Sequence, residues 1–486
     1  MSVFDEIVKP KFSVLTDSQI ERILEGAFGI CQIIGQKVYS EKALKIFKSA
    51  GCTVNENNVK IPKDIIVEAL STIPEGFKLY SRNGEYFLDI HGRNSYFGTG
   101  VTTPNILDIY SGERRPFMVK DIELSAKVAD TLENIDFVMP LGYVADVKPE
   151  IADMYHFIYT LKNTNKPIPF ICYDKYGVEA IVEIASEVRG GLEALKEKPF
   201  LITYTQSTPA LIHEKDALEK LMLSVELGIP TIYYSAPIIG SNSPCTYAGA
   251  ITQSIAEDIL GLVLSQIIKK GAKMISGMAP HPLDFQTANI SVGAPEFNLG
   301  ICAVAEIFQK LKIPTFGCAG LSDSKIFDEQ SAIENCFSTV FNLLAGNNII
   351  HDQGYLEGGM VGSIANIVMG NEIIGMAKRI YRGFKINEET LAFDVIKTLG
   401  PGAFYLQEMH TLNNFKKEYW FPSLMDKKIY ATWKEDGSKT MKVRVDEKTR
   451  ELARSINPHE IDNELFKQLL KIKEKSEKFR SKKYME

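Results

Sequence analysis

The stretch Pro314-Thr-Phe-Gly-Cys-Ala-Gly320 is a short apolar run without helical periodicity, and it ends in small residues. Such a run is typical of a buried parallel strand that brings its backbone close to a ligand. A polar loop, Leu321–Lys325, follows it, and the next segment begins a helix near Asp328 and ends it at Gly346. A second apolar run, Asn348–Asp352, completes a strand–loop–helix–strand unit. In such units the loop after each strand carries the chemistry.

The same alternation of short apolar runs and amphipathic helices extends over most of the chain. Parallel strands need helical crossovers, and eight such repeats are what a (β/α)8 barrel requires. We disfavour an open doubly wound sheet, because no GxGxxG motif follows the first run and no P-loop is present. The eight runs are Tyr96–Gly98, Phe137–Leu141, Ile168–Tyr173, Phe200–Thr205, Thr231–Tyr234, Lys273–Ser276, Thr315–Cys318 and Asn348–His351.

We therefore predict an α/β protein built on a (β/α)8 barrel of the TIM type at residues 77–385. An N-terminal helical extension at 1–76 precedes the barrel, and a C-terminal extension with a terminal helix follows it at 386–486. Thr16-Asp-Ser-Gln19 is a capping box that begins an N-terminal helix. The alternating pattern around Arg82-Asn-Gly-Glu85 predicts a hairpin.

The C-terminal extension carries two further signals. The basic, helix-prone segment Lys467–Lys483 is expected to form a solvated helix, with docking of a partner as the alternative. Aromatic residues that we interpret as anchors lie upstream of it: Phe404, Tyr405, Tyr419, Trp420 and Phe421.

The composition excludes several classes of protein. A formal net charge of −6 argues against a nucleic-acid-binding protein, which would show a basic face. The seven cysteines lack paired spacing, which is typical of reduced thiols in a cytoplasmic protein. We expect no signal peptide, and no apolar run approaches the ~20 residues of a membrane span. We therefore expect a cytoplasmic protein that binds neither nucleic acid nor membrane.

If the barrel forms, its active site lies at the carboxyl ends of the strands. A single tyrosine at such a position is usually a core residue, but six of the eight predicted strand ends carry one. Ring faces attract cations that lack hydrogen-bond donors, such as a quaternary ammonium. We predict no metal site, because the sequence has no HxC, HxxH or CxxC pair to hold zinc. The six tyrosines are Tyr96, Tyr143, Tyr173, Tyr204, Tyr234 and Tyr355.

Two motifs together resemble one known family. The first comprises Gly317–Lys325, Asp328–Gln330 and Glu334, and the second comprises Gly400–Thr411 and Glu418–Leu424. They resemble the trimethylamine methyltransferase superfamily, and the resemblance covers nearly the whole chain. The chain contains no pyrrolysine, so it is similar to the branch without this residue, whose members demethylate quaternary amines such as betaines.

The resemblance implies a reaction and its partners. A methyl group would move from a betaine-type quaternary amine to Co(I) of a corrinoid (cobalamin) that a cognate corrinoid protein carries. The chain itself would bind no cofactor tightly, and it would form a homo-oligomer. A quaternary nitrogen leaves as a neutral tertiary amine, so the enzyme needs no general acid. It needs a cage that aligns one methyl group with the nucleophile.

We assign roles to residues as hypotheses. Gln330 and Glu334 stand four residues apart on one helix face, and Glu334 would supply a compensating negative charge. Lys325 has the best position for a betaine carboxylate, ahead of Arg82, Arg93, Arg114 and Arg115. The predicted catalytic residues are His351, Gln330 and Glu334, and the predicted substrate-binding residues are Tyr96, Tyr204, Gln206, Tyr234, Tyr355 and Lys325.

Three other functions compete with this interpretation. A Schiff-base lyase would need a lysine near the mouth, and Lys273 lies at the wrong end of its strand. A glycosidase would need two carboxylates on different strands, whereas Asp352 and Glu357 belong to one strand and its loop. A non-catalytic protein that binds quaternary amines would share the aromatic cage, and only turnover separates it from the enzyme.

Overall fold

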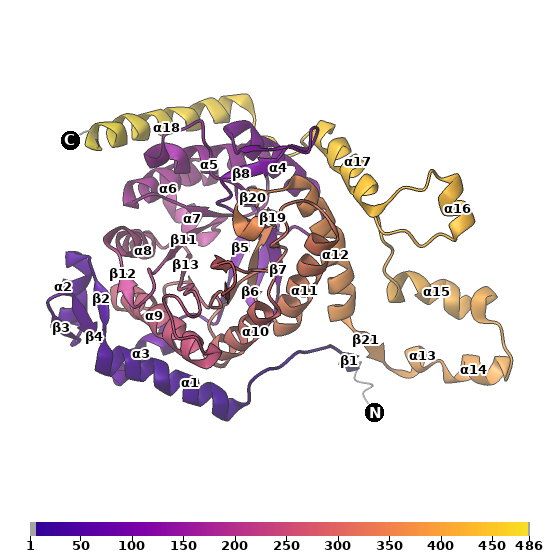
Figure 1. Ribbon diagram of the computed structural model, residues 1–486, viewed down its shortest axis with the longest axis horizontal. Helices are drawn as coiled ribbons and strands as arrows, with labels where there is room; N and C mark the ends of the chain where they lie inside the picture. The colour runs from indigo at the N-terminus through magenta and orange to yellow at the C-terminus, as the bar shows by residue number, and fades with distance from the viewer. Residues whose placement is uncertain (1–5, 485–486) are drawn as a thin grey trace.

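The computed structural model describes residues 6–484, and its central feature is a ring of parallel backbone pairings (Figure 1). Four strands pair in the order β10-β11-β13-β14, and three pair in the order β17-β18-β7. Ser276 pairs with Thr315 between the two groups. On the other side Phe137 pairs with β7, and the Val138 N–H donates to the segment before β10. The named strands are β7 (Tyr96–Thr99), β10 (Ile168–Ile171), β11 (Leu201–Gln206), β13 (Thr231–Tyr234), β14 (Met274–Ile275), β17 (Phe316–Cys318) and β18 (Ile349–Gln353).

All eight predicted apolar runs take part in this ring, and helices cover its outer side (Figure 1). Local sequence sets the helix ends. The Asp174 carboxylate accepts from the Gly177 N–H at the start of α6, and Gly190 ends it with a φ of 85°. A capping box at Asp328 begins α11, and Gly346 ends it, as predicted. The helices are α4 (Val119–Thr131), α5 (Pro149–Asn163), α6 (Lys175–Arg189), α7 (Leu192–Glu197), α8 (Lys215–Leu227), α9 (Tyr247–Ile268), α10 (Pro295–Lys310), α11 (Glu329–Ala345) and α12 (Ile364–Arg382).

The helix α9 differs from the sequence-based expectation that no apolar stretch would be long enough to span a membrane. By length and composition this 22-residue helix could cross one, with a mean hydropathy of 1.3 in its most apolar window. Of that window, however, 83% is buried inside the protein. Burial of this extent is typical of a core helix.

A β-hairpin, β5 (Gly76–Tyr80) and β6 (Phe87–His91), forms as predicted and lies at the amino-terminal end of the ring. Its contacts go to residues that precede strands. The Tyr80 N–H donates to the Pro199 carbonyl, just before β11, over 2.7 Å. The Arg82 N–H donates to the Asn165 carbonyl, just before β10, also over 2.7 Å. The opposite, carboxyl-terminal end of the ring is therefore the end left for a site.

Short strands in the loops surround this carboxyl-terminal end. One antiparallel pair lies in the loop after β14, and a four-stranded group in the order β19-β20-β8-β9 joins the loops after β18 and β7. The bounds are β8 (Asn105–Leu107), β9 (Arg114–Pro116), β15 (Leu283–Asp284), β16 (Asn289–Ile290), β19 (Tyr355–Leu356), the 3-10 turn Glu357–Gly359 and β20 (Val361–Gly362).

The N-terminal segment contains the predicted helices and also a small sheet. Thr16 forms the expected capping box with Gln19, and Ile20, Leu24 and Ala27 are buried. The sheet has the order β12-β2-β4-β3 and was not predicted, because its strands have only two or three residues each. The elements are β1 (Glu6–Val8), α1 (Asp17–Gly29), the π-helix Ile30–Ile34, β2 (Gln36–Val38), α2 (Glu41–Ser49), β3 (Thr53–Asn55), β4 (Asn58–Lys60), α3 (Lys63–Thr72) and β12 (Ile212–His213).

The chain after α12 divides into two parts. Residues 384–417, which we call the arm, contain no buried residue, and Figure 1 shows α13 and α14 well outside the ring of helices. After the arm, the chain returns to α12 at residues 418–425, where the Glu372 carboxylate accepts from the N–H groups of Ser423 and Leu424. The elements are β21 (Phe384–Ile386), which pairs with β1, α13 (Glu388–Leu391), α14 (Phe393–Leu399), the 3-10 turn Tyr405–Gln407, α15 (Met409–Glu418), α16 (Tyr430–Glu435), α17 (Met441–Arg454) and α18 (Asn463–Lys483).

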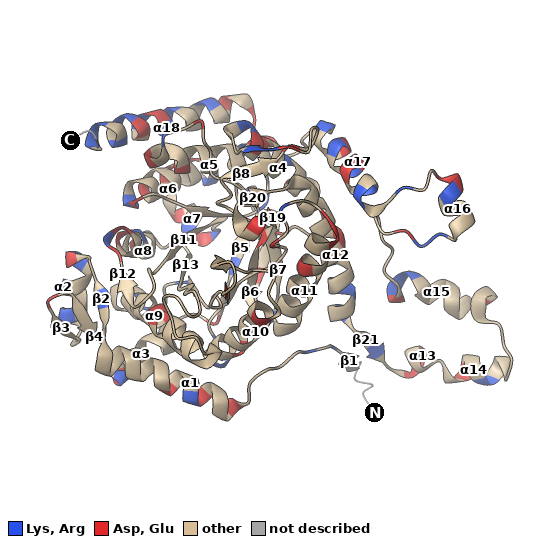
Figure 2. Ribbon diagram, viewed as in Figure 1, with Lys and Arg blue, Asp and Glu red and all other residues tan. Residues whose placement is uncertain are grey.

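The helix α18 is not the solvated helix that its composition predicted. Charged residues lie along its whole length (Figure 2), but it packs on α5 and α6 and buries Leu469. Its Arg480 is fully buried and donates two hydrogen bonds, of 2.7 and 2.9 Å, to the carboxylate of Asp153. Asp174, the cap of α6, lies 3.5 Å from the same guanidinium. The prediction failed because Arg480 is neutralised by residues distant in sequence.

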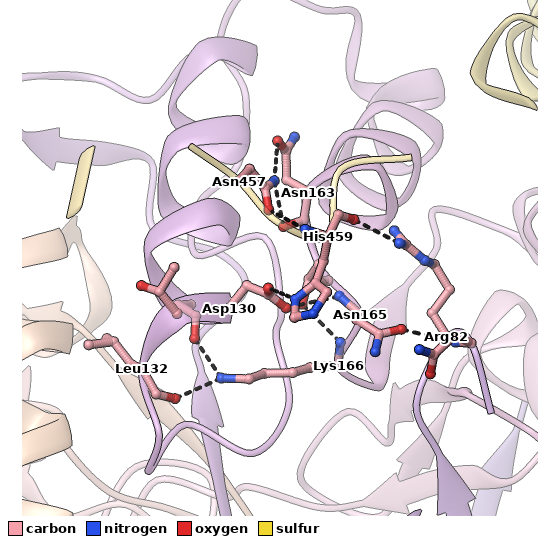
Figure 3. Close-up of polar contacts among 12 residues, drawn as sticks. Arg82, Asp130, Leu132, Asn163, Asn165, Lys166, Asn457 and His459 are labelled. Atoms are coloured by element: carbon pink, nitrogen blue, oxygen red, sulfur yellow. Dashed lines mark hydrogen bonds and ion pairs between the residues drawn. The ribbon is translucent and has the colours of Figure 1, made fainter. Parts of the chain in front are cut away.

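A second cluster of polar contacts holds the segment between α17 and α18 (Figure 3). His459 Nδ1 lies 2.5 Å from the Asp130 carboxylate, which also accepts from the Thr164 hydroxyl over 2.6 Å. The Arg82 guanidinium donates to the His459 carbonyl over 2.7 Å. Asn457 donates to the Asn163 carbonyl over 3.1 Å. The segment is therefore tied to α4, α5 and the hairpin at once.

Candidate functional site

The interior of the ring holds a buried group of rings, the aromatic cluster: Tyr204, Tyr234, Phe316 and His351. Tyr204 and Tyr234 stack with their centroids 5.4 Å apart and their planes 15° apart. Phe316 lies 5.3 Å from each of them and 4.3 Å from His351. Side chains of a closed ring of strands alternate between inside and outside. Four strands that are distant in sequence therefore deliver these rings to one place.

The tyrosine hydroxyls of the cluster form hydrogen bonds with each other and with Gln206. The Tyr204 and Tyr234 hydroxyls share a short hydrogen bond, and the Tyr234 hydroxyl lies 2.5 Å from the Gln206 side-chain oxygen. Burial raises the pKa of both tyrosines, so both hydroxyls are neutral. Gln206 is exposed at the end of β11, where the cluster meets the mouth. The two rings are thus held in place, and their hydroxyls are already engaged.

Tyr355 is fixed in a similar way. Its hydroxyl accepts from the backbone N–H groups of Val101 and Thr102 over 2.6 and 2.7 Å. Its ring lies against Gly100, where a Cβ atom would stand 2.0 Å from a ring carbon. Only glycine permits this approach. The loop after β7 therefore sets the position of Tyr355.

Asp352 is a buried carboxyl group with few partners. It is 8% exposed, and its backbone adopts a φ of 80°, which is uncommon for a residue other than glycine. In residues 6–484 its one polar side-chain neighbour is His351, with Nε2 3.5 Å from Oδ1. Burial raises the pKa of Asp352 to about 8. His351 in turn packs on Phe316 and Tyr204, with ring centroids 4.3 and 5.9 Å apart, so Asp352 lies beside the aromatic cluster.

His351 is neutral, and a hydrogen bond fixes the orientation of its ring. Its Nδ1 lies 3.1 Å from the Gly317 carbonyl oxygen, which can only accept, so this nitrogen carries the proton. Burial lowers the pKa of His351 to about 3. The unprotonated Nε2 therefore faces Asp352. This geometry suits a residue that positions a neighbour better than one that donates a proton at neutral pH.

Two buried carboxyl groups of α9 hold the strand ends that bear the cluster. Glu257 accepts from the hydroxyls of Ser207 and Ser235 over 2.8 and 2.7 Å. Asp258 accepts from the Ser235 N–H over 2.6 Å, and burial raises its pKa well above the usual value. These contacts join the ends of β11 and β13, and they explain why an apolar helix carries two adjacent acids.

Tyr96 is the predicted cage residue that the structure places elsewhere. It is the first residue of β7 and pairs with Ile349, the first residue of β18. It therefore lies at the amino-terminal end, where its hydroxyl accepts from the Asp89 N–H over 3.0 Å. We remove Tyr96 from the cage. Tyr173 also lies apart, because it is 51% exposed and packs against Tyr484.

Lys325 lies in the loop after β17, Glu334 accepts hydrogen bonds from that loop, and Gln330 donates to Glu334. Glu334 accepts from the Ser322 hydroxyl over 2.5 Å and from the Asp323 N–H over 2.8 Å. Gln330 is exposed and donates to Glu334 over 2.9 Å. Their catalytic roles stay predictions, and the contacts observed are those of residues that shape a loop.

The structure distinguishes the five basic candidates for a substrate carboxylate. Arg114 pairs with Glu357, and Arg115 pairs with Asp108 and Asp121. Arg82 and Arg93 donate to backbone carbonyls away from the mouth. Lys325 is exposed, and its ammonium donates to the Asp323 carbonyl over 2.8 Å. Lys325, Arg82 and Arg93 form no ion pair with an acidic side chain of residues 6–484, and of these three only Lys325 lies in a loop that follows a strand end of the ring.

The sequence interpretation missed Asp352 and Phe316 as parts of the site. The sequence presents Asp352 as half of a carboxylate pair with Glu357, although its place directly after His351 at a strand end is a usable signal. Phe316 offered no such signal, because a phenylalanine in an apolar run resembles any core residue. Within the part of the chain that the structure describes, no three His, Cys, Asp or Glu side chains are grouped as a metal site.

Comparisons with known proteins agree with this architecture. The family model of trimethylamine methyltransferase (MTTB) matches residues 4–478. The chain belongs to this family. It is 31% identical over 460 residues to the glycine betaine methyltransferase of Desulfitobacterium hafniense, covering 94% of this chain and 95% of that protein. It is 30% identical over 491 residues to the trimethylamine methyltransferase MttB of Methanosarcina barkeri, covering 98% and 97%.

Membership of the MTTB family confirms the resemblance seen in the two motifs, and it makes the chain a methyltransferase. A solved structure, the monomethylamine methyltransferase MtmB of Methanosarcina barkeri, superimposes with a TM-score of 0.53. The match covers 91% of this chain and 88% of that one, at 12% identity. At this identity the match supports the fold alone.

Proposed function

We propose that the ring is a (β/α)8 barrel whose mouth binds a betaine-type quaternary amine and presents one methyl group to a corrinoid on a separate protein. The corrinoid supplies the Co(I) nucleophile that accepts the methyl group. The domain boundaries 1–76, 77–385 and 386–486 belong to this proposal. So does a cytoplasmic location, which the seven free cysteines support.

The observation that carries the proposal is the buried carboxyl group of Asp352 beside the aromatic cluster, 3.5 Å from His351 Nε2. Burial raises the pKa of Asp352 to about 8, so its ionised form needs a compensating cation, and His351, whose pKa burial lowers to about 3, does not supply one. The hydroxyls of Tyr204 and Tyr234 are bound to each other and to Gln206. The rings therefore offer their faces and few free hydrogen-bonding groups. A cation without N–H donors fits this surrounding better than a primary ammonium does.

The chemistry of the substrate fits the protonation states of the site. Breaking the methyl–nitrogen bond leaves the electron pair on nitrogen, so a neutral tertiary amine departs without a proton. The neutral His351 can orient Asp352 and the ammonium head. Each favourable contact between the cation and a desolvated ring would contribute about 1–2 kcal/mol. Lys325, in the loop after β17, is the candidate for the carboxylate end of a betaine.

The pH dependence of binding tests the role of Asp352. Its carboxyl group is protonated below pH 8 and must lose the proton to pair with a cation. The affinity for glycine betaine should therefore fall about tenfold for each pH unit below 8, because only the ionised fraction binds well. Isothermal titration from pH 6 to 9 measures this without any corrinoid. The variant Asp352→Asn should bind weakly and independently of pH.

Asp64→Asn, in an exposed position on α3, is the matched control and should titrate like the unaltered protein. A pH-independent affinity in the unaltered protein would remove Asp352 from the site. Turnover is tested separately, by the loss of Co(I) absorbance when reduced cobalamin meets a panel of betaines without oxygen. Transfer from a betaine but not from trimethylamine supports the proposal. Binding without transfer, even with the cognate corrinoid protein, would favour a non-catalytic binding protein.

A further inference from the structure

Three polar side chains form a continuous row of hydrogen bonds from the aromatic cluster to the mouth of the ring. Tyr204 and Gln206 stand two residues apart on β11, so both side chains point to the same side of the strand. Gln206 pairs in register with Tyr234 on the neighbouring strand β13. The Tyr204 and Tyr234 hydroxyls share a hydrogen bond, and the Tyr234 hydroxyl contacts the Gln206 side-chain oxygen. We call Tyr204, Tyr234 and Gln206 the polar row.

The direction of the hydrogen bonds in the polar row follows from the chemistry of its groups. The contact between the Tyr234 hydroxyl and the Gln206 amide is 2.5 Å long, which suits an O–H···O bond and is too short for an N–H···O bond. The amide oxygen therefore faces Tyr234, and because it can only accept, the Tyr234 hydroxyl donates to it. The Tyr204 hydroxyl in turn donates to the Tyr234 oxygen. The reverse order would leave the buried Tyr204 O–H without an acceptor in residues 6–484.

The two ends of the polar row consequently carry opposite partial charges. Both hydroxyl hydrogens point along the row toward Gln206, so the Tyr204 oxygen keeps only lone pairs at the inner end. At the outer end the Gln206 NH2 group carries two donors, and neither has a partner within residues 6–484. Hydrogen bonds in such a chain polarise one another, which increases the difference between the two ends.

The inner, negative end of the row lies on the side of Asp352. The Tyr204 ring is 5.9 Å from the His351 ring, and His351 Nε2 is 3.5 Å from the Asp352 carboxyl group. Gln206, by contrast, is exposed at the end of β11. A ligand with a cationic head and an anionic tail matches both ends of this row. A simple cation matches only the inner end.

The strand ends that carry the row are held in place from behind. The Ser207 N–H donates to the Tyr234 carbonyl over 3.0 Å. The hydroxyls of Ser207 and Ser235 both donate to the buried Glu257 carboxylate. The backbone next to Gln206 is therefore tied to the backbone next to Tyr234. A donor that is positioned before the ligand arrives loses little freedom on binding.

We propose that Gln206 selects zwitterionic amines by donating from its NH2 group to the substrate carboxylate, and that Tyr234 is a positioning residue that directs this amide. The inference rests on the proposed function, because it names the group that reads the far end of the betaine. Lys325 adds the attraction of an exposed charge, which is not directional. The strand-end position of Gln206 is visible in the sequence, but which of its atoms faces the ligand depends on Tyr234.

Isothermal titration at pH 9, where Asp352 is ionised, tests the assignment without a corrinoid. The two ligands are glycine betaine and tetramethylammonium, which has the same kind of head but no carboxylate. The unaltered protein should bind glycine betaine about tenfold more tightly or better. Gln206→Glu keeps the shape and the bond from Tyr234 but replaces the donors with a negative charge. It should weaken glycine betaine binding about tenfold or more and leave tetramethylammonium binding equal or stronger.

A second variant tests the positioning role. Tyr234→Phe keeps the ring and removes the hydroxyl that directs the amide, so the preference for glycine betaine should fall roughly threefold or more while tetramethylammonium binding changes little. A merely structural role would weaken both ligands together, and that result would overturn the role of Tyr234. Gln286→Glu, the same substitution in the exposed turn between β15 and β16, is the control and should leave the preference unchanged.

The outcomes separate this inference from the proposed function. If the unaltered protein binds both ligands and Gln206→Glu does not change their ratio of affinities, the inference is wrong and the proposed function stands. Equal affinities of the unaltered protein for the two ligands would also overturn it. If the unaltered protein binds neither ligand, the proposed function fails, and the inference fails with it.

Discussion

Residues 384–417 and residues 441–484 both belong to the C-terminal region, but they meet the rest of the protein in opposite ways. The arm is rich in aromatic and aliphatic residues and buries none of them. The later stretch ends in α18, in which eleven of 21 residues are charged, and it packs on α5 and α6. Composition alone predicts the reverse. The difference teaches that a charged helix docks when a few of its charges find fixed partners.

The partners of α18 are specific and buried. Arg480 binds Asp153 through two hydrogen bonds, and His459 binds Asp130 just before the helix begins. Planar guanidinium groups match carboxylates in this paired geometry. Within residues 6–484, no apolar side chain of the arm is buried, and a hydrophobic contact needs area more than a fixed geometry.

The largest effect is expected at Arg480. The variant Arg480→Ala leaves Asp153 buried without its cation, and the free energy of unfolding should fall by about 3–5 kcal/mol. Urea denaturation of the full-length chain measures it. Lys478→Ala, two residues earlier on the exposed side of α18, should change it by less than about 0.5 kcal/mol. Equal effects of the two variants would mean that α18 docks through its general charge.

A smaller effect is expected at His459. Its side chain is 46% exposed, and the Asp130 carboxylate keeps its bonds to Thr164 and Asn165 when the imidazole is removed. His459→Ala should therefore lower the free energy of unfolding by about 1 kcal/mol. A loss as large as that at Arg480 would show that the segment in Figure 3 holds α18 in place.

The smallest effect on a single chain is expected in the arm. Phe393→Ser removes a ring that is 67% exposed, so the free energy of unfolding of the dilute chain should change by less than about 0.5 kcal/mol. Thermal unfolding over a hundredfold range of protein concentration is the measurement. The unaltered chain and the variant should unfold at nearly the same temperature, because the ring is exposed in the single chain. A large loss at every concentration would show that the arm packs on its own body.

Much of the fold could be predicted because its signals are local. The eight strand runs, the capping box at Thr16 and the ends of α11 each depend on neighbouring residues. The site was harder to predict from the sequence. Tyr96 stands in a genuine strand, but which end of the ring it occupies depends on where that strand begins to pair. Rings on other strands form the surroundings of Asp352, and no local sequence pattern indicates how close those rings lie to it.

The pairing of Asp153 with Arg480 joins residues 327 positions apart in the chain. A ribosome adds roughly 5–20 residues each second, so Asp153 emerges about 15–65 s before its partner is made. During this interval the α5 side of the nascent protein carries a carboxylate without its cation. Translation thus delays the completion of this face, and a product truncated before residue 480 would be left with a lasting defect. Cellular proteases that survey new proteins could recognise such a product by its loosened α5 and α6.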